Sequence, residues 1–133
     1  LGARGGNAEE RALADDAAER AAELGFDSLE ALARLAVAEH ALGSGDTHAS
    51  LRHAQRALRL SDALGGMEED GGALFRVLGD AFEAAGREAE AERARARGRA
   101  TVQAAAARIG DRHWRERFLH DVEAHRALLG EGP

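Results

Sequence analysis

The sequence contains no cysteine and no lysine, and its single proline is Pro133, the last residue. Without cysteine the chain forms no disulfide and offers no thiolate to a metal ion, and a reducing compartment is permitted. All 18 basic residues are arginine, which excludes lysine-based catalysis. No apolar run approaches the roughly 18 residues that span a bilayer. We therefore expect a soluble, cytoplasmic protein without a membrane partner.

Residues that favour strands are also scarce. Aromatic side chains make up 4% of the 133 residues, and runs of β-branched residues are nearly absent. Apolar residues reach 44%, mainly through alanine, a composition typical of thin helix-on-helix packing. The length fits one domain, so the sequence predicts a single all-α domain over residues 1–133. Heavy use of arginine, alanine and glycine indicates a GC-rich bacterial genome, and the missing initiator methionine indicates a piece of a longer protein.

A pattern of large and small residues occurs twice at helical spacing and ends each time at a glycine. Each copy is followed by an alanine-rich helix, so the unit is a helix-turn-helix of roughly forty residues. One unit cannot bury its apolar face alone, and copies therefore stack into a solenoid. The two copies consist of Leu32, Leu35, Ala36, Leu42 and Gly43 in the first half and Phe75, Leu78, Gly79, Phe82 and Gly86 in the second.

Glycines and capping residues divide the chain further. Gly25 is expected to end a first helix, and Asp27 with Glu30 three positions later predicts a capping box at the start of the second. Asp46 or Thr47 is expected to cap the third helix. The predicted organisation is a half repeat at 1–25, repeats at 27–66 and 72–109, and a capping helix at 111–130 that carries Trp114 and Phe118.

Apolar stripes indicate which side of each helix is buried. In the first helix the stripe is Leu13, Ala17, Ala21 and Leu24, and in the second it is Leu29, Leu32, Leu35, Ala36 and Leu42. In the fifth helix, glycine at position 98 costs about 1 kcal/mol relative to alanine. We interpret Gly98 as a point of close helix packing and not as a hinge.

Charge is distributed unevenly around the formal net of −6. Residues 1–70 hold 14 acidic residues against 7 arginines, whereas 87–117 hold 9 arginines against 5 acidic residues. Such a polar molecule can form head-to-tail contacts or bind a charged partner. The alternative is that these charges lie on solvated outer faces of helices, supported by pairs at helical spacing.

The second copy resembles the tetratricopeptide repeat, in its large first-helix residues, small contact residue, aromatic, turn glycine and second-helix alanine. The first copy is similar but has Glu39 in place of the aromatic and two extra residues in the turn. The resemblance implies a right-handed stack of antiparallel hairpins that acts in protein binding. The residues that carry it are Phe75, Leu78, Gly79, Phe82, Gly86 and Ala91, with Leu35, Ala36 and Gly43 in the first copy.

The tail from Arg108 resembles the C-terminal end of large bacterial signalling proteins, which combine a kinase or cyclase domain, an ATPase module and such repeats. This resemblance implies a docking or sensor arm. In the repeat family the first helix of each hairpin lines the concave face, where a peptide or protein segment binds. These positions are Glu30, Arg34, Val37 and His40 in one repeat and Arg76, Asp80 and Glu83 in the next.

A mixed groove with Arg34 and Arg76 could hold an acidic segment, because guanidinium groups pair bidentately with carboxylates. The alternative, which the sequence favours, is that both arginines are solvated. The family's lysine-based carboxylate clamp is excluded. The six histidines lack i, i+4 spacing, so no metal site is predicted, and the alternating arginines of 93–99 point around their helix, which disfavours nucleic acid. No catalytic motif or cofactor-binding loop is present. Two alternatives stay open: a homodimer formed through Leu13, Ala17 and Leu24, or a regulatory arm of an attached kinase or ATPase.

Overall fold

The structure is a computed structural model that describes residues 2–67, 71–107 and 127–128. Over this part of the chain the helices are joined by short turns and there is no strand, which confirms the predicted all-α class. Ala127 and Leu128 are also helical. The five long helices are α1 (Gly2–Leu24), α2 (Asp27–Gly43), α3 (Thr47–Leu64), α4 (Gly71–Ala84) and α5 (Glu88–Ala107).

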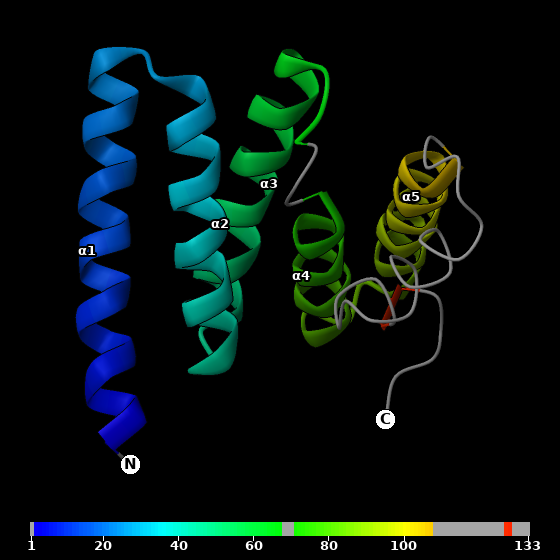
Figure 1. The fold of residues 1–133 in the computed structure, drawn as a ribbon. Coiled ribbons are helices and arrows are strands. Elements are labelled where there is room, and N and C mark those ends of the chain that lie inside the picture. Colours follow the sequence, from blue (N-terminus) through cyan, green and yellow to red (C-terminus); the bar gives the residue numbers. More distant parts are fainter. Residues whose placement is uncertain (1, 68–70, 108–126, 129–133) are drawn as a thin grey trace.

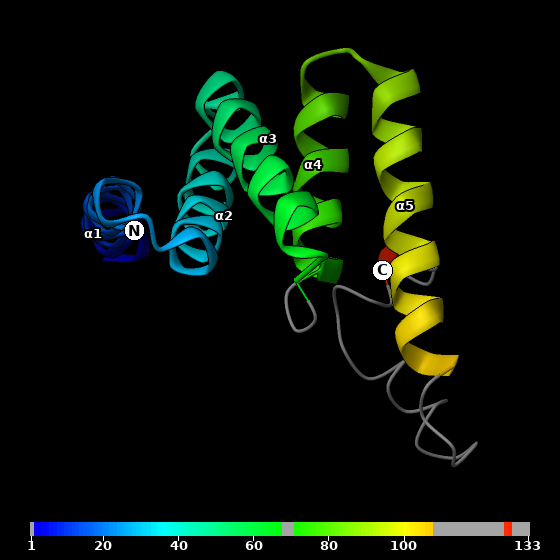
Figure 2. The same cartoon turned by 90° about the horizontal axis from the view of Figure 1, so that it is seen from above.

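The helices follow one another in chain order across the molecule, with α1 at one side and α5 at the other (Figure 1). The view from above gives the same order (Figure 2). Helices α2 and α3 pack together, as do α4 and α5, and α4 also contacts both α2 and α3. Helix α1 packs on α2. Each hairpin therefore buries a face against its neighbour in the chain.

The first four helices end in the same way. Gly25, Gly45, Gly65 and Gly86 have φ angles of 74°, 83°, 86° and 76°, a left-handed conformation that favours glycine. At each end the glycine N–H donates to the carbonyl three residues earlier, and the following N–H donates to the carbonyl five residues earlier. This is the Schellman motif, which satisfies carbonyls that a helix end leaves open.

These turns fix the register between the two hairpins. The bonds Asp46 N–H to Ala41 O and Arg87 N–H to Phe82 O are both 2.8 Å long and lie 41 residues apart. With this offset, Val37 and Ala38 of α2 correspond to Leu78 and Gly79 of α4. In the second helices Ser50 and Ala57 then correspond to Ala91 and Gly98, and all four are buried.

The predicted register of the first repeat is therefore wrong by two residues. Leu35, Ala36 and Gly43 had been matched with Leu78, Gly79 and Gly86, but Gly43 is the last residue of α2 and has no positive φ. The left-handed glycine is Gly45, so the first turn contains no extra residues relative to the second. The leucine spacing of α2 imitates the apolar spacing of α4, which explains the error.

Of the helix caps predicted for α2 and α3, only the cap of α3 is confirmed. Asp46 caps α3 as expected, because its Oδ1 accepts the Ala49 N–H at 3.2 Å. The capping box at Asp27 is wrong: the N-cap residue of α2 is Phe26, and no side chain caps this end. Glu30 does not reach back to the helix start because its carboxylate binds Arg34 and Arg56 instead.

Gly98 lies where α5 meets α4, as the sequence predicted. A Cβ atom at Gly98 would stand 2.8 Å from Phe75 Cβ and 2.8 Å from Leu128 Cδ2. Both neighbours belong to the buried core, together with Leu74, Val77 and Leu78 of α4. The expected cap residues Trp114 and Phe118 lie outside the described residues. Among the helices described, none has the length and apolar character needed to cross a membrane.

Candidate functional site

Helix α1 packs on α2 through its small side chains. Ala18 and Ala21 are buried, whereas Leu13 and Leu24 are 72% and 65% exposed. The predicted stripe is therefore only partly right, because it placed both leucines with Ala21. Alanine allows close approach between two helices, and the leucines lie on the side of α1 that turns away from this contact.

Helix α2 also leaves leucines in solvent. Its side toward α3 is marked by Glu30, which binds Arg56 of α3, and by Arg34, which contacts His53 of α3. Leu32 and Leu29 precede Arg34 by two and five residues, which places them about 160° and 140° around the helix at roughly 100° per residue. Both are exposed, so their predicted place in a buried stripe is wrong.

The exposed leucines of α1 and α2 lie on one side of the pair. His40 Nε2 of α2 stands 3.6 Å from Glu10 Oε2 of α1 and marks the edge where these sides meet. Leu13 and Leu24 follow Glu10 by 3 and 14 residues, and Leu29 precedes His40 by 11, spacings that keep each set on one helix face. We name as the apolar strip the exposed residues Leu13, Leu24, Phe26, Leu29 and Leu32.

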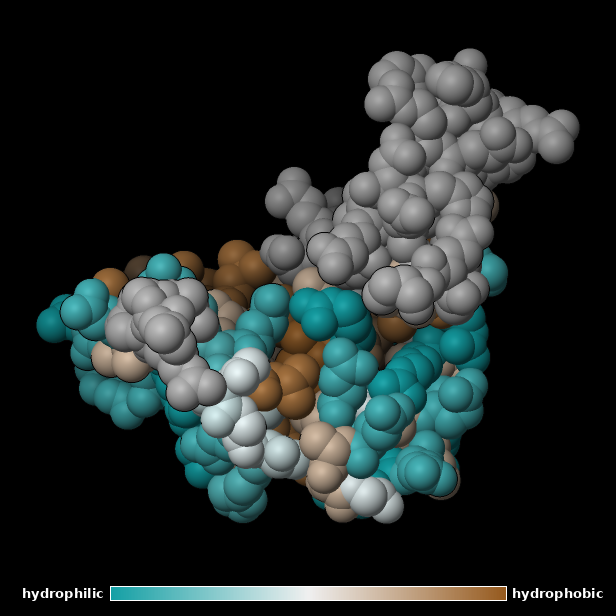
Figure 3. Space-filling view, turned by 90° about the horizontal axis from the view of Figure 1, so that it is seen from below, coloured by the Kyte–Doolittle hydropathy of each residue, from teal (hydrophilic) through white to brown (hydrophobic). Residues whose placement is uncertain are grey.

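Apolar surface is also visible when the molecule is viewed from below. Figure 3 shows hydrophobic surface in a hollow that hydrophilic side chains border. Single exposed apolar residues are common on soluble proteins, whereas apolar residues that gather on one side of a helix pair point to an interaction surface. The apolar strip is such a gathering, since its five residues come from one face of α1, one face of α2 and the turn between them.

Beside the strip, α2, α4 and α5 carry linked charges, which we name the charged ladder: Glu39, Arg76, Asp80, Arg95 and Glu83. Arg76 Nη2 lies 3.4 Å from Glu39 Oε2 and its Nη1 lies 3.7 Å from Asp80 Oδ2. Arg95 donates to Asp80 at 3.0 Å and to Glu83 at 2.9 Å. The aliphatic part of the Arg95 side chain crosses α4 at Gly79, where a Cβ would stand 2.9 Å from Arg95 Cγ.

The predicted concave-face residues do not all reach one surface. Arg76, Asp80 and Glu83 lie together in the charged ladder. Glu30 and Val37 are each 1% exposed, so neither can meet a partner, and their assignment is corrected. The cause is the register error, because two residues correspond to about 160° around a helix.

The other two predicted residues of α2 lie on different sides. Arg34 is held on the α3 side by Glu30 and His53, whereas His40 faces Glu10 of α1. Arg34 and Arg76 therefore do not line one groove for an acidic segment. Sequence reasoning missed Leu29, Leu32 and Glu39 as exposed residues of α2. The signal that locates them is Gly45, the left-handed glycine that pairs with Gly86.

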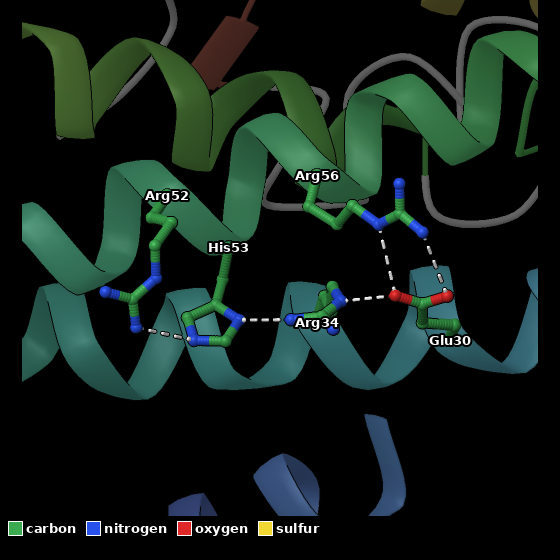
Figure 4. Close-up of polar contacts among 5 residues, drawn as sticks. All are labelled: Glu30, Arg34, Arg52, His53 and Arg56. Atoms are coloured by element: carbon green, nitrogen blue, oxygen red, sulfur yellow. Dashed lines mark hydrogen bonds and ion pairs between the residues drawn. The ribbon is translucent and has the colours of Figure 1, made fainter. Parts of the chain in front are cut away.

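A buried polar cluster joins α2 and α3 (Figure 4). The Glu30 carboxylate accepts from Arg34 Nε at 2.6 Å and from Arg56 Nε at 3.2 Å. Burial alone would raise the pKa of Glu30, but the hydrogen bonds and charges of Arg34 and Arg56 together lower it. Glu30 is therefore a carboxylate at neutral pH, and it holds two arginines in place.

His53 lies in the same cluster and is 6% exposed. Its Nδ1 stands 3.1 Å from Arg34 Nη1 and its Nε2 stands 3.3 Å from Arg52 Nη2. Burial lowers the pKa of His53, and the charges of Arg34 and Arg52 lower it further. The imidazole is neutral at pH 7 for these reasons.

Comparison with known proteins yields no relatives: no family model, no curated protein and no solved structure matches the chain. Within residues 2–67, 71–107 and 127–128, no three histidine or carboxylate side chains come together as ligands for a metal ion. The features that distinguish the described residues are therefore the apolar strip and the charged ladder on the surface, and the buried polar cluster around His53.

Proposed function

We propose that the chain is a protein-interaction module that binds a peptide or protein segment along the apolar strip. The observation that carries this proposal is the exposure of large apolar residues on one side of α1 and α2. Burying a leucine side chain contributes about 1.5–3 kcal/mol, so a partner that covered several of these residues would gain appreciable affinity.

The resemblance to the tetratricopeptide repeat supports the same function. In a stack of that kind the first helices of successive hairpins share one face, and in this chain α2 and α4 would be those helices. With the offset of 41 residues, Leu32 and Glu39 on α2 correspond to Ala73 and Asp80 on α4. The ion pair between Glu39 and Arg76 joins the two helices on this face. The partner would therefore lie over the apolar strip and meet the charged ladder at its edge.

The charges around the strip favour a partner segment with aliphatic anchors and basic flanks. Glu9, Asp16 and Glu23 of α1 are exposed near Leu13 and Leu24, and Glu39 lies exposed beyond Leu32. Arg20 is close to Asp16 but both side chains are largely in solvent, where such pairs contribute little. An acidic rim of this kind steers positively charged segments toward the strip.

Selection of peptides from a random displayed library on the immobilised protein tests the proposal. Enriched peptides are expected to carry aliphatic residues flanked by arginine or lysine. Replacing Leu29 and Leu32 by serine should weaken their binding at least about a hundredfold, given the burial energy of two leucines. Leu64→Ser is the matched control, since Leu64 has the same 44% exposure as Leu32 but lies on α3. Equal binding by the double variant and the control would contradict the proposal.

Self-association is a second candidate, because Leu13 and Leu24 are exposed as this alternative requires. Light scattering after size exclusion, at low and high salt, distinguishes the two. A mass near the 14.1 kDa of one chain at every concentration would eliminate self-association. A dimer that persists in salt and dissociates in the Leu13→Ser/Leu24→Ser variant would support it. Control of an attached kinase or ATPase stays a prediction from the resemblance alone.

A further inference from the structure

The ring of His53 faces an arginine at each of its two nitrogens (Figure 4). A guanidinium group only donates hydrogen bonds, whereas a neutral imidazole has one donor nitrogen and one acceptor nitrogen. One of the two contacts must therefore place an N–H group against another N–H group. Protonation of His53 would not relieve this, because both ring nitrogens would then be donors facing cations.

The better-held arginine decides which nitrogen is the acceptor. Arg34 is fixed by its 2.6 Å hydrogen bond to Glu30 and is 19% exposed, so we assign its Nη1 as the donor to His53 Nδ1 at 3.1 Å. The ring proton is then on Nε2 and points toward Arg52 Nη2 at 3.3 Å. Leaving a buried N–H without an acceptor destabilises the fold.

Arg52 also lacks a partner of opposite charge: among the described residues its one polar side-chain contact is His53. Its side chain is exposed and long enough to rotate outward. Charges on α1 act on His53 as well, since Asp15 raises the pKa of His53 and Arg11 lowers it. On α2, Glu30 is already bound by Arg34 and Arg56. The N–H donor of His53 and the N–H donors of Arg52 therefore both lack an anionic acceptor, and one anion between them would serve both.

We propose that His53 and Arg52 form a binding site for a phosphate or carboxylate group. One oxygen of the oxyanion accepts from His53 Nε2–H, and the others accept from the Arg52 guanidinium after its side chain has moved outward. Such charge-assisted bonds are stronger than neutral ones. The site lies on the α3 side of α2, opposite Leu29 and Leu32, and it is independent of the proposed binding along the apolar strip.

Titration of the whole chain with inorganic phosphate at constant ionic strength tests this site, with the ring signals of the six histidines followed by NMR. Phosphate should produce a saturable change at His53, and it should raise the pKa of His53 because a bound anion stabilises the imidazolium form. Acetate is the second ligand. A response to phosphate alone identifies a phosphate site, and a response to both identifies a general oxyanion site.

Two variants make the result specific. Arg52→Gln should weaken phosphate binding at least about tenfold, whereas Arg59→Gln, an exposed arginine two turns along the same face of α3, should leave it unchanged. A response that never saturates, or that both variants reduce equally, would overturn the proposal. It would also fail if phosphate had no effect on the ring signals of His53.

Discussion

Replacing Gly98 by alanine is expected to destabilise the protein, although alanine is the better helix former. In an exposed helix interior the change would contribute about 1 kcal/mol of stability. At position 98 the new Cβ would stand 2.8 Å from Phe75 Cβ and 2.8 Å from a methyl carbon of Leu128. Phe75 Cβ is attached to the backbone of α4 and cannot move alone. Overpacking of this kind costs about 1–3 kcal/mol, and the gain in helix propensity offsets about 1 kcal/mol of it, so the net loss should be up to about 2 kcal/mol.

Two other glycines of the chain serve as matched controls. A Cβ at Gly43 meets nothing within 4 Å, and Gly43 is helical, so Gly43→Ala should stabilise the protein by up to about 1 kcal/mol. A Cβ at Gly79 would meet the flexible side chain of Arg95 at 2.9 Å. That side chain can shift at the expense of exposed ion pairs, which contribute about 0–1 kcal/mol. Gly79→Ala should therefore be close to neutral.

Urea unfolding followed by circular dichroism measures all three variants against the parent chain. The Gly43→Ala variant is expected to be the most stable, followed by Gly79→Ala and then Gly98→Ala. The parent chain should be less stable than Gly43→Ala and more stable than Gly98→Ala. The order is the decisive result, because it depends on what each Cβ meets and not on helix propensity, which is the same change at all three positions. A Gly98→Ala variant as stable as the Gly43→Ala variant would refute the close packing of α5 on α4.

Three further predictions concern the charged and exposed residues. Glu30→Gln should lower the free energy of unfolding by about 2–3 kcal/mol in urea, because it leaves Arg34 buried without its carboxylate, whereas Glu83→Gln, whose pair with Arg95 is exposed, should cost at most about 1 kcal/mol. The fold lowers the pKa of His53, so the unfolded chain binds the proton more readily and stability should fall as the pH drops below about 6.5. The variant His53→Gln should flatten this dependence when unfolding is measured between pH 7 and 5. An unchanged slope would contradict the burial of His53. Replacing both Leu13 and Leu24 by serine should change the free energy of unfolding in urea by no more than about 0.5 kcal/mol. A larger loss would mean that these leucines are packed.

Much of the fold could be predicted because its helix ends depend on local chemistry. Gly25 and Gly86 end helices where a left-handed residue is needed, and the Asp46 carboxylate accepts an N–H at the start of α3. The buried side of α5 was also predictable, since Ala91, Ala94 and Val102 recur at helical spacing and are buried. These signals require only neighbouring residues, so a single sequence carries them.

The buried polar residues could not be predicted in the same way. Glu30 and His53 are buried and Arg34 is half-buried between two helices, and these positions depend on the charge and hydrogen bonds that the cluster supplies. Read separately along the sequence, each is a polar residue that belongs on the surface. The prediction that the exposed leucines are buried was wrong for the converse reason. The contact between α1 and α2 uses alanines such as Ala18, which a search for large apolar residues does not detect.

The position of the proposed binding face depends most on the register of α2. An alignment of the two repeats by leucine spacing matches Gly43 with Gly86. It shifts the register of α2 by two residues, which is a rotation of about 160° around the helix. That rotation exchanges the two sides of α2, so buried Val37 is taken for a surface residue and exposed Leu32 for a core residue. Backbone hydrogen bonds at the turns give the register independently of any assumption about which apolar residues are buried. In this chain the left-handed glycines, and not the leucines, are therefore the positions from which the solvent-facing side of each helix should be counted.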